Sequence, residues 1–274
     1  MEPLHAIVLG LVQGLTEYLP ISSTAHLRVV PALLGWADPG AAFSAVVQLG
    51  TLLAVLVYFA RDLWRLARAF LVGLARRRPF AEPEARLAWM LVLGTLPIGV
   101  AGLVFQDAIE TSLRSLWVVS AALAGLALVL ALAERVGRRA SGLGGLGWGG
   151  GLAIGLAQAL ALVPGVSRSG VTITAGLFAG LTRAEAARFS FLLSVPAVAA
   201  SGLYELLALA RDLPEGVPWL GVGLGTAASF ASGLAAIAFL MRFLARHSTW
   251  VFVVYRLALA GVLAVLLCTG VLQP

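Results

Sequence analysis

The sequence predicts an all-α polytopic membrane protein with six transmembrane helices and two opposed re-entrant helical hairpins. Its 274 residues are 60% hydrophobic and only 12% charged, with a mean hydropathy of +0.97. Soluble domains carry about a quarter of charged residues, so this composition excludes an ordinary soluble enzyme. The lengths of the apolar runs and the two polar clusters that interrupt them predict the rest. We expect one membrane domain over residues 1–274.

Six apolar runs reach about 20 residues, the length that crosses a hydrocarbon core of about 30 Å. They are 41–60, 87–105, 116–133, 186–207, 219–241 and 251–272. Four shorter runs form two pairs, each split by a polar turn with Pro, Gly and Ser: 4–19, 24–35, 148–163 and 170–181. Such backbone is tolerated inside a membrane where protein or a watery cavity surrounds it. We therefore predict re-entrant hairpins at 4–35 and 148–181.

The arginines between the runs predict the topology. Loop 61–86 carries seven arginines and the loop after residue 133 carries three, whereas linkers 106–115 and 208–218 are richer in acidic residues. Arg-rich loops face the cytoplasm, so both termini and the opening of the first hairpin are expected outside. The net charge of +6 thus indicates topology rather than nucleic-acid binding. Segment 63–75 is expected to be a cytoplasmic interfacial helix.

The two hairpins resemble each other in sequence, which predicts an inverted repeat. The alignments pair Gly10-Leu-Val-Gln13-Gly-Leu with Gly155-Leu-Ala-Gln158-Ala-Leu, and, loosely, Pro20-Ile-Ser22-Ser23 with Pro164-Gly-Val-Ser167. Chance similarity between Leu/Ala/Gly-rich helices is the alternative, but the opposite predicted orientations of the halves are independent support. Repeat one covers about 1–133 and repeat two about 148–274.

The first hairpin holds a polar cluster that is costly inside a membrane unless it is paired or functional. Gln13 and Glu17 are four residues apart and share a helix face. Glu17 could ligate a divalent cation, act as a general base, or pair structurally with an arginine. The amide oxygen of Gln13 could help to hold a metal or a substrate.

Three hydroxyl residues, Ser22, Ser23 and Thr24, open the next predicted helix, which is a signature of helix capping. His26 can share a face with these serines, and a serine within reach of a histidine is a minimal activated nucleophile. A histidine that is merely hydrogen-bonded in the core is the alternative for His26.

Arg168, at the tip of the second hairpin, is the sharpest signal. An arginine at membrane depth is costly unless it meets an anion, and a guanidinium binds phosphate as a bidentate fork. The helix that starts near Gly170 aims free N–H groups at the same place. A structural pair with Glu17 is the alternative. The neighbouring candidates for phosphate binding are Ser167, Ser169, Gly170 and Thr172.

Arg256 in the last span is either a second anion ligand or a residue near the cytoplasmic end. Together, the carboxylate, the imidazole, the arginine, the hydroxyls and the two helix N-termini suit a phosphate group. A diphosphate carries more negative charge than one arginine neutralises. A Mg²⁺ or Ca²⁺ ion held partly by Glu17 is therefore expected. Apolar spans could hold the lipid end of the substrate.

The two clusters match the motifs of a known family. A Glu or Gln followed by Glu and then Pro-x-Ser-Ser-Thr-x-His matches Gln13, Glu17, Pro20, Ser22, Ser23, Thr24 and His26. Pro-Gly-x-Ser-Arg-Ser-x-x-Thr matches Pro164, Gly165, Ser167, Arg168, Ser169 and Thr172. The chain resembles, over essentially its whole length, the undecaprenyl-diphosphate phosphatases, bacterial membrane enzymes of the bacitracin-resistance type.

This resemblance implies removal of the terminal phosphate of undecaprenyl diphosphate at the outer face of the bacterial cytoplasmic membrane, which recycles the carrier lipid for peptidoglycan. It implies Ser23 as a candidate nucleophile, Arg168 as phosphate ligand, Glu17 in metal binding or proton transfer, and His26 as an acid or base. Many members have Glu at the position of Gln13. A mechanism that needs two carboxylates at this place is therefore less suited to this chain, and the role of the carboxylate falls to Glu17.

Two other functions fit part of the pattern. A polyprenyl-phosphate flippase would share the inverted repeat and the anion site. An intramembrane serine protease would use Ser23 and His26 but would bring no anion for Arg168. The sequence leaves open a homodimer, the metal, and whether Ser23 or water attacks the phosphorus.

Overall fold

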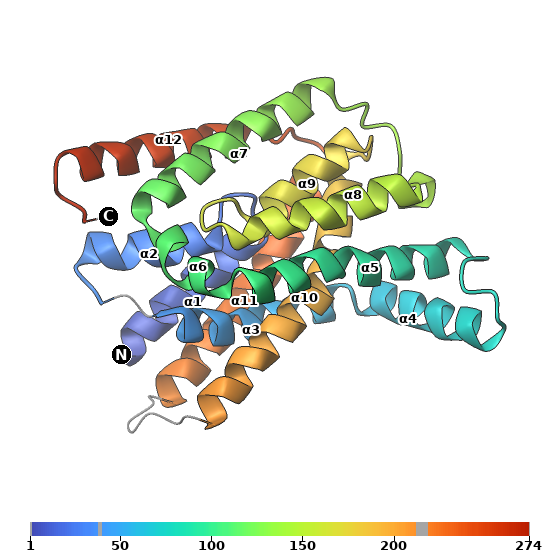
Figure 1. The fold of residues 1–274 in the computed structure, drawn as a ribbon, viewed down its shortest axis with the longest axis horizontal. Coiled ribbons are helices and arrows are strands. Elements are labelled where there is room, and N and C mark those ends of the chain that lie inside the picture. Colours follow the sequence, from blue (N-terminus) through green and yellow to red (C-terminus); the bar gives the residue numbers. More distant parts are fainter. Residues whose placement is uncertain (1, 38–39, 212–218, 274) are drawn as a thin grey trace.

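A computed structural model describes residues 2–37, 40–211 and 219–273 (Figure 1). In these ranges the chain is helical, without a strand, apart from one isolated bridge between Ser141 and Leu181. The all-α prediction is therefore confirmed. The α-helices are α1 Pro3–Glu17, α2 Ser23–Leu34, α3 Gly40–Tyr58, α4 Ala60–Ala75, α5 Pro83–Val104, α6 Gln106–Glu110, α7 Leu116–Val136, α8 Trp148–Gln158, α9 Arg168–Phe178, α10 Arg183–Arg211, α11 Trp219–Leu244 and α12 Trp250–Cys268. The 3₁₀ turns are η1 Ser112–Arg114, η2 Leu143–Gly145 and η3 Ala159–Leu162.

The six predicted spans each coincide with a helix. In α5, α7, α10, α11 and α12, a single helix contains a stretch long and apolar enough to cross a membrane. The sixth, α3, qualifies jointly with α4, and the two helices are bent by 78° at the break between them. The α4 helix thus leaves the direction of the span, as expected of an interfacial helix, and its Trp64 is 71% exposed.

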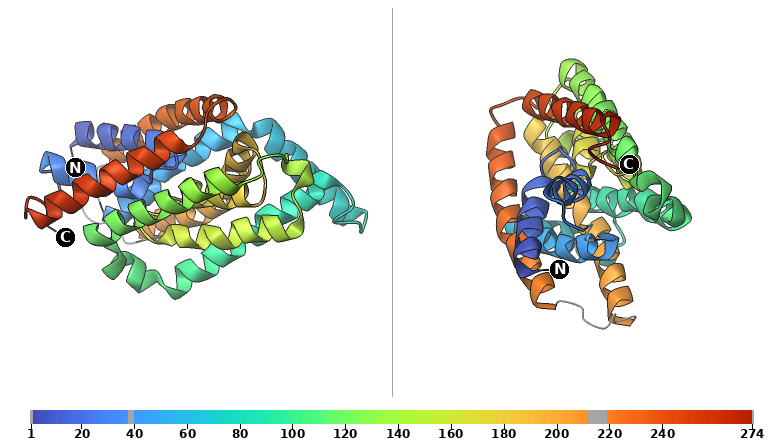
Figure 2. Two further views of the ribbon diagram at one scale, coloured as in Figure 1. Left: turned by 90° about the horizontal axis from the view of Figure 1, so that it is seen from above. Right: turned by 90° about the vertical axis from the view of Figure 1, so that its left-hand side faces the viewer.

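Both termini lie at the same end of the molecule, as Figure 1 and Figure 2 show. The opposite end holds α4, its turn into α5, and the connection from α7 to α8. The two Arg-rich segments therefore gather away from the termini, in line with the predicted topology. Of the two acidic linkers, the first forms α6 and η1, and most of the second lies outside the described residues.

The two predicted hairpins are α1–α2 and α8–η3–α9, and each is packed through glycine. A Cβ atom on Gly10 of α1 would lie 2.1 Å from the carbonyl oxygen of Gly225 in α11. A Cβ atom on Gly155 of α8 would lie 2.3 Å from the Cα atom of Gly94 in α5. Only glycine permits such backbone contact. The first helix of each hairpin is thus held by the same kind of contact.

The second helix of each hairpin starts in the same way. Ser22 has φ 74° and its hydroxyl accepts the N–H of Ala25, while Ser167 has φ 73° and accepts the N–H of Gly170. Both positive φ angles are unusual for a residue with a side chain. Ser22, rather than Ser23, is thus the counterpart of Ser167, one residue from the loose sequence alignment. These parallels support the repeat, whose inverted orientation stays a prediction.

The second hairpin rests on a fully apolar base, which fixes the helix that carries Arg168. Ile173 and Leu177 of α9 and Phe189 and Leu192 of α10 are each no more than 1% exposed and belong to one core cluster. Close packing at this density leaves little freedom for the start of α9.

Candidate active site

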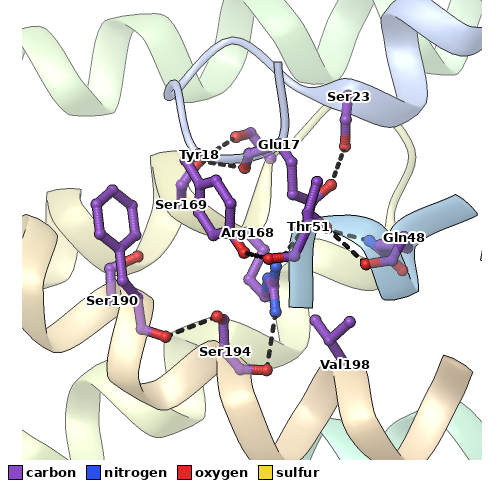
Figure 3. A network of polar contacts seen from close by, with 12 residues as sticks. Glu17, Tyr18, Ser23, Gln48, Thr51, Arg168, Ser169, Ser190, Ser194 and Val198 are labelled. Atoms are coloured by element: carbon purple, nitrogen blue, oxygen red, sulfur yellow. Dashed lines mark hydrogen bonds and ion pairs between the residues drawn. The ribbon is translucent and has the colours of Figure 1, made fainter. Parts of the chain in front are cut away.

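Glu17, at the end of α1, is the centre of the polar network (Figure 3). The residue is 5% exposed, yet its carboxylate accepts four hydrogen bonds. The donors are Gln13 Nε2 at 2.8 Å, Ser23 Oγ at 2.6 Å, Gln48 Nε2 at 3.1 Å and Arg168 Nη2. A carboxylate so fully bonded is held in one orientation, as acid–base chemistry requires.

Arg168 is the first residue of α9, and its ion pair with Glu17 joins the two hairpins. Its other terminal nitrogen, Nη1, donates to the carbonyl of Ser194 at 3.2 Å (Figure 3). The structural pair considered as an alternative is therefore present. Breaking such a pair by removing one partner leaves an uncompensated buried charge. An anionic ligand that binds Arg168 in place of Glu17 would leave the Glu17 carboxylate without its ion-pair partner.

Ser23 is the first residue of α2, and its hydroxyl donates to Glu17. The N-terminus of α2 carries the positive end of the helix dipole, which favours negative charge on the serine oxygen. Ser22 caps the helix, so capping does not require the hydroxyl of Ser23. The pair has the geometry of a nucleophile with its general base.

His26 lies behind this pair and not beside it. Its Nδ1 is 2.7 Å from the carbonyl oxygen of Ser22, and its Nε2 is 2.6 Å from the hydroxyl of Tyr255 in α12. Both ring nitrogens are therefore engaged away from Ser23. Glu17, rather than His26, is the base that the structure places against the serine.

Three residues of the second cluster make hydrogen bonds within the protein, and one of them joins the two hairpins. Ser169 donates to the carbonyl oxygens of Glu17 and Leu19, at 3.3 and 3.0 Å. Thr172 donates to Ser190 Oγ at 2.6 Å, and the N–H of Gly170 is taken by the cap. These contacts join α9 to the first hairpin and to α10.

Arg256 is fully buried in α12 and braces both hairpin tips. Its guanidinium donates to the carbonyl oxygens of Pro20 and Gly165, at 3.2 and 2.9 Å, and also to two carbonyls of α7. Because all three nitrogens donate to backbone carbonyls, Arg256 has a bracing role in this structure, and Arg168 stays the candidate for anion binding.

A cavity of about 550 Å³ opens beside the ion pair. Half of the twelve predicted site residues line it: Glu17, Ser22, Ser23, Thr24, Ser167 and Arg168. The other half lie outside its lining: Gln13, His26, Ser169, Gly170, Thr172 and Arg256. The rest of the wall is mostly apolar and, apart from Gln48 of α3, comes from α5, α6, η3 and α10.

Gln48 of α3 is a site residue that the sequence analysis did not single out. It lines the cavity and donates to Glu17 (Figure 3). A signal was present, because Ser44, Gln48 and Thr51 recur at helical spacing in an otherwise apolar span. Tyr18 was missed too, and its hydroxyl bonds to the carbonyl of Thr51.

The types of residue at the polar end of the cavity suit a hard divalent cation. Carboxylate and amide oxygens, as in Glu17 and Gln48, are the ligands that Mg²⁺ and Ca²⁺ prefer. Within the described part of the chain, no group of three or more His, Cys, Asp or Glu side chains is placed to hold a metal. Such an ion would therefore depend on substrate phosphates for further ligands, as Mg²⁺ commonly does.

The fold and the site define a polytopic helical membrane protein with a buried Glu17–Arg168 ion pair at one end of a largely apolar cavity. Residues 6–262 match the family described as bacitracin resistance protein BacA, so the chain belongs to this family. It is 55% identical to an undecaprenyl-diphosphatase of Myxococcus xanthus, over all of this chain and 92% of that protein. Proteins of the same name from Chlorobaculum tepidum and Chlorobium phaeobacteroides are each 52% identical over the full length of both chains.

Proposed function

We propose that this protein hydrolyses undecaprenyl diphosphate to undecaprenyl phosphate and inorganic phosphate, and so recycles the carrier lipid. One observation carries the proposal: the Ser23 hydroxyl donates to Glu17, which pairs with Arg168, at the polar end of an otherwise apolar cavity. A diphosphate ester of a long lipid alcohol has the two ends that such a cavity needs. The names of the relatives agree with this substrate.

Substrate binding begins with the terminal phosphate on Arg168. The phosphate competes with Glu17 for the guanidinium, and the N-termini of α2 and α9 add positive potential. As Arg168 turns to the phosphate, Glu17 loses its ion-pair partner. The carboxylate is then available to accept the proton of the Ser23 hydroxyl, to which it is already hydrogen-bonded.

The reaction then follows two displacements. Ser23 Oγ attacks the terminal phosphorus as its proton passes to Glu17, and the bridging P–O bond breaks to release undecaprenyl phosphate. Water next attacks the phosphoserine, Glu17 returns its proton to Oγ, and the protons of the water leave with inorganic phosphate. Arg168 stabilises the charge on the phosphoryl oxygens in both steps.

A divalent cation is part of the proposal. Glu17 and Gln48, with the phosphates, would hold Mg²⁺ or Ca²⁺, which neutralises diphosphate charge when bound.

The protein is a multi-pass membrane protein, and we place it in the bacterial cytoplasmic membrane with the cavity open to the outer face. The Arg-rich end opposite the termini then faces the cytoplasm. A homodimer stays a prediction, which light scattering on the purified protein tests.

The deciding experiment measures phosphate release from undecaprenyl diphosphate by purified protein, with Mg²⁺, with Ca²⁺ and with a chelator. Arg168→Ala is tested in parallel. We expect release that needs the ion and that this substitution abolishes. A folded protein that binds the lipid without releasing phosphate would overturn the proposal, and release that resists chelation would remove the cation from it.

A further inference from the structure

The apolar part of the cavity has a distinct shape. Its walls are Thr95, Ile98, Gly99, Gly102 and Leu103 of α5, Gln106 and Ile109 of α6, Ala161 and Leu162 of η3, and Ala197, Val198, Ala200 and Ser201 of α10. Alanine and glycine make up five of these residues, so the space exists because side chains there are small. It is continuous with the polar end at Ser23 and Arg168.

Two glycines of α5 leave bare backbone on this wall. A Cβ atom on Gly99 would meet no other atom within 4 Å, and one on Gly102 would meet only Leu162 Cδ2, at 3.8 Å. Gly10 and Gly155 differ in this respect, because close helix contact demands glycine there. Helix packing therefore does not explain Gly99 and Gly102, whereas an occupant of the cavity would.

The cavity also has an exit toward lipid. Leu103 lines it and is 75% exposed, and its neighbours on α5, Val100 and Val104, are 61% and 68% exposed. Leu160, beside the η3 wall, is 58% exposed. An apolar chain that starts at the polar end can thus leave past the exposed Leu103 into the hydrocarbon along a largely apolar wall.

We propose that this wall is the subsite for the second and following isoprene units of the substrate, with Gly99 and Gly102 as its specificity-determining residues. The ligand class is a diphosphate ester of a polyisoprenoid alcohol, whose tail leaves past Leu103. This inference rests on the proposed function and assigns the direction in which the lipid lies. Side chains at the two glycines exclude the tail while the phosphate site stays intact.

The first test fills the wall and compares substrates of different length. Gly99→Leu and Gly102→Leu are assayed with undecaprenyl diphosphate and with five-carbon dimethylallyl diphosphate. The control is Gly125→Leu in α7, where a Cβ likewise meets nothing within 4 Å but the residue lies outside the cavity lining. We expect the α5 variants to raise KM for the long substrate about tenfold or more, a loss typical of a filled apolar pocket, with little change for the short one. The control should change neither, and equal losses on both substrates would overturn the subsite.

The second test does not depend on turnover. A polyprenyl phosphate with a photoreactive diazirine on its second isoprene unit is cross-linked to the wild-type protein, and the labelled peptides are identified. Labelling within 95–109, at 161–162 or within 197–201 supports the subsite even if no phosphate is released, in which case only the proposed reaction fails. Normal phosphate release with labelling elsewhere overturns the subsite and leaves the proposed function standing.

Discussion

Ser23 in the first hairpin and Arg168 in the second occupy the same place, as the first residue of a helix capped by a serine of positive φ. Their separation is 145 residues (168 minus 23), and the same separation relates Gly10 to Gly155. The backbone of the two hairpins is thus alike where it is most constrained. The proposed nucleophile and the proposed phosphate ligand therefore stand on equivalent backbone positions and meet through Glu17.

The side chains behind these positions differ. At the same separation, Glu17 corresponds to Leu162, which lines the apolar wall. Gln13, bonded to Glu17, corresponds to Gln158, whose buried amide has no hydrogen-bond partner. In the proposed mechanism, the first half therefore supplies the acid–base chemistry, while the second supplies the cation and part of the lipid wall.

The largest effect is expected at Ser23. Ser23→Ala removes the nucleophile, and phosphate release should fall about 1000-fold or more, as it does when a covalent catalyst loses its nucleophile. The control is Ser112→Ala, which alters an exposed hydroxyl outside the cavity lining. Full turnover by Ser23→Ala would mean that water attacks the phosphorus directly, with Glu17 as its base.

Substitutions of the two members of the ion pair, Glu17 and Arg168, should have different effects on kcat and on lipid binding. Glu17→Gln removes the base and should lower kcat by about 100-fold or more, the scale of general-base catalysis. It also ends the competition for Arg168, so undecaprenyl phosphate should bind at least as tightly as to the wild type. Arg168→Ala should lose that binding, as measured by calorimetry. Equal weakening by both substitutions would indicate that the pair is only structural.

The two glutamines provide a smaller contrast. Gln13→Leu removes a donor from Glu17, and kcat should fall about tenfold, the effect of one hydrogen bond to a charged group. Gln158→Leu removes a buried amide without partners and should raise stability by about 1 kcal/mol. Phosphate release should not change in this second variant. Thermal unfolding and phosphate release are measured for both variants. A loss of stability in Gln158→Leu would contradict this prediction.

The smallest effect is expected at Tyr255, which positions the first hairpin through His26. Tyr255→Phe should lower kcat about threefold, the cost of one neutral hydrogen bond, and leave KM unchanged. His26→Val introduces the residue type found at the equivalent position of the second hairpin, Val171. It should lower kcat more than Tyr255→Phe does, because the carbonyl of Ser22 loses its contact with the imidazole. Because Tyr255 acts through its hydrogen bond to His26, the double variant Tyr255→Phe with His26→Val should have a kcat no lower than that of His26→Val alone. Additive losses would show that Tyr255 acts independently.

Much of the fold could be predicted because its signals are local. Apolar length predicted the spans, the distribution of arginines predicted which loops share an end, and the hydroxyl residues Ser22, Ser23 and Thr24 marked the start of α2. The bend after α3 agrees with the predicted interfacial helix 63–75, because the apolar run stops there while the helix continues as α4.

The sequence by itself determined the membrane class, the hairpins and the residue types of the site, since hydropathy, periodicity and capping depend on neighbours along the chain. Only the tertiary structure decided which of those residues meet. It placed Gln48 on Glu17, turned His26 toward Tyr255, and directed Arg256 to backbone carbonyls instead of the cavity. These outcomes depend on how distant helices approach, and that approach is set by contacts such as Gly10 against Gly225, whose partner no local pattern specifies.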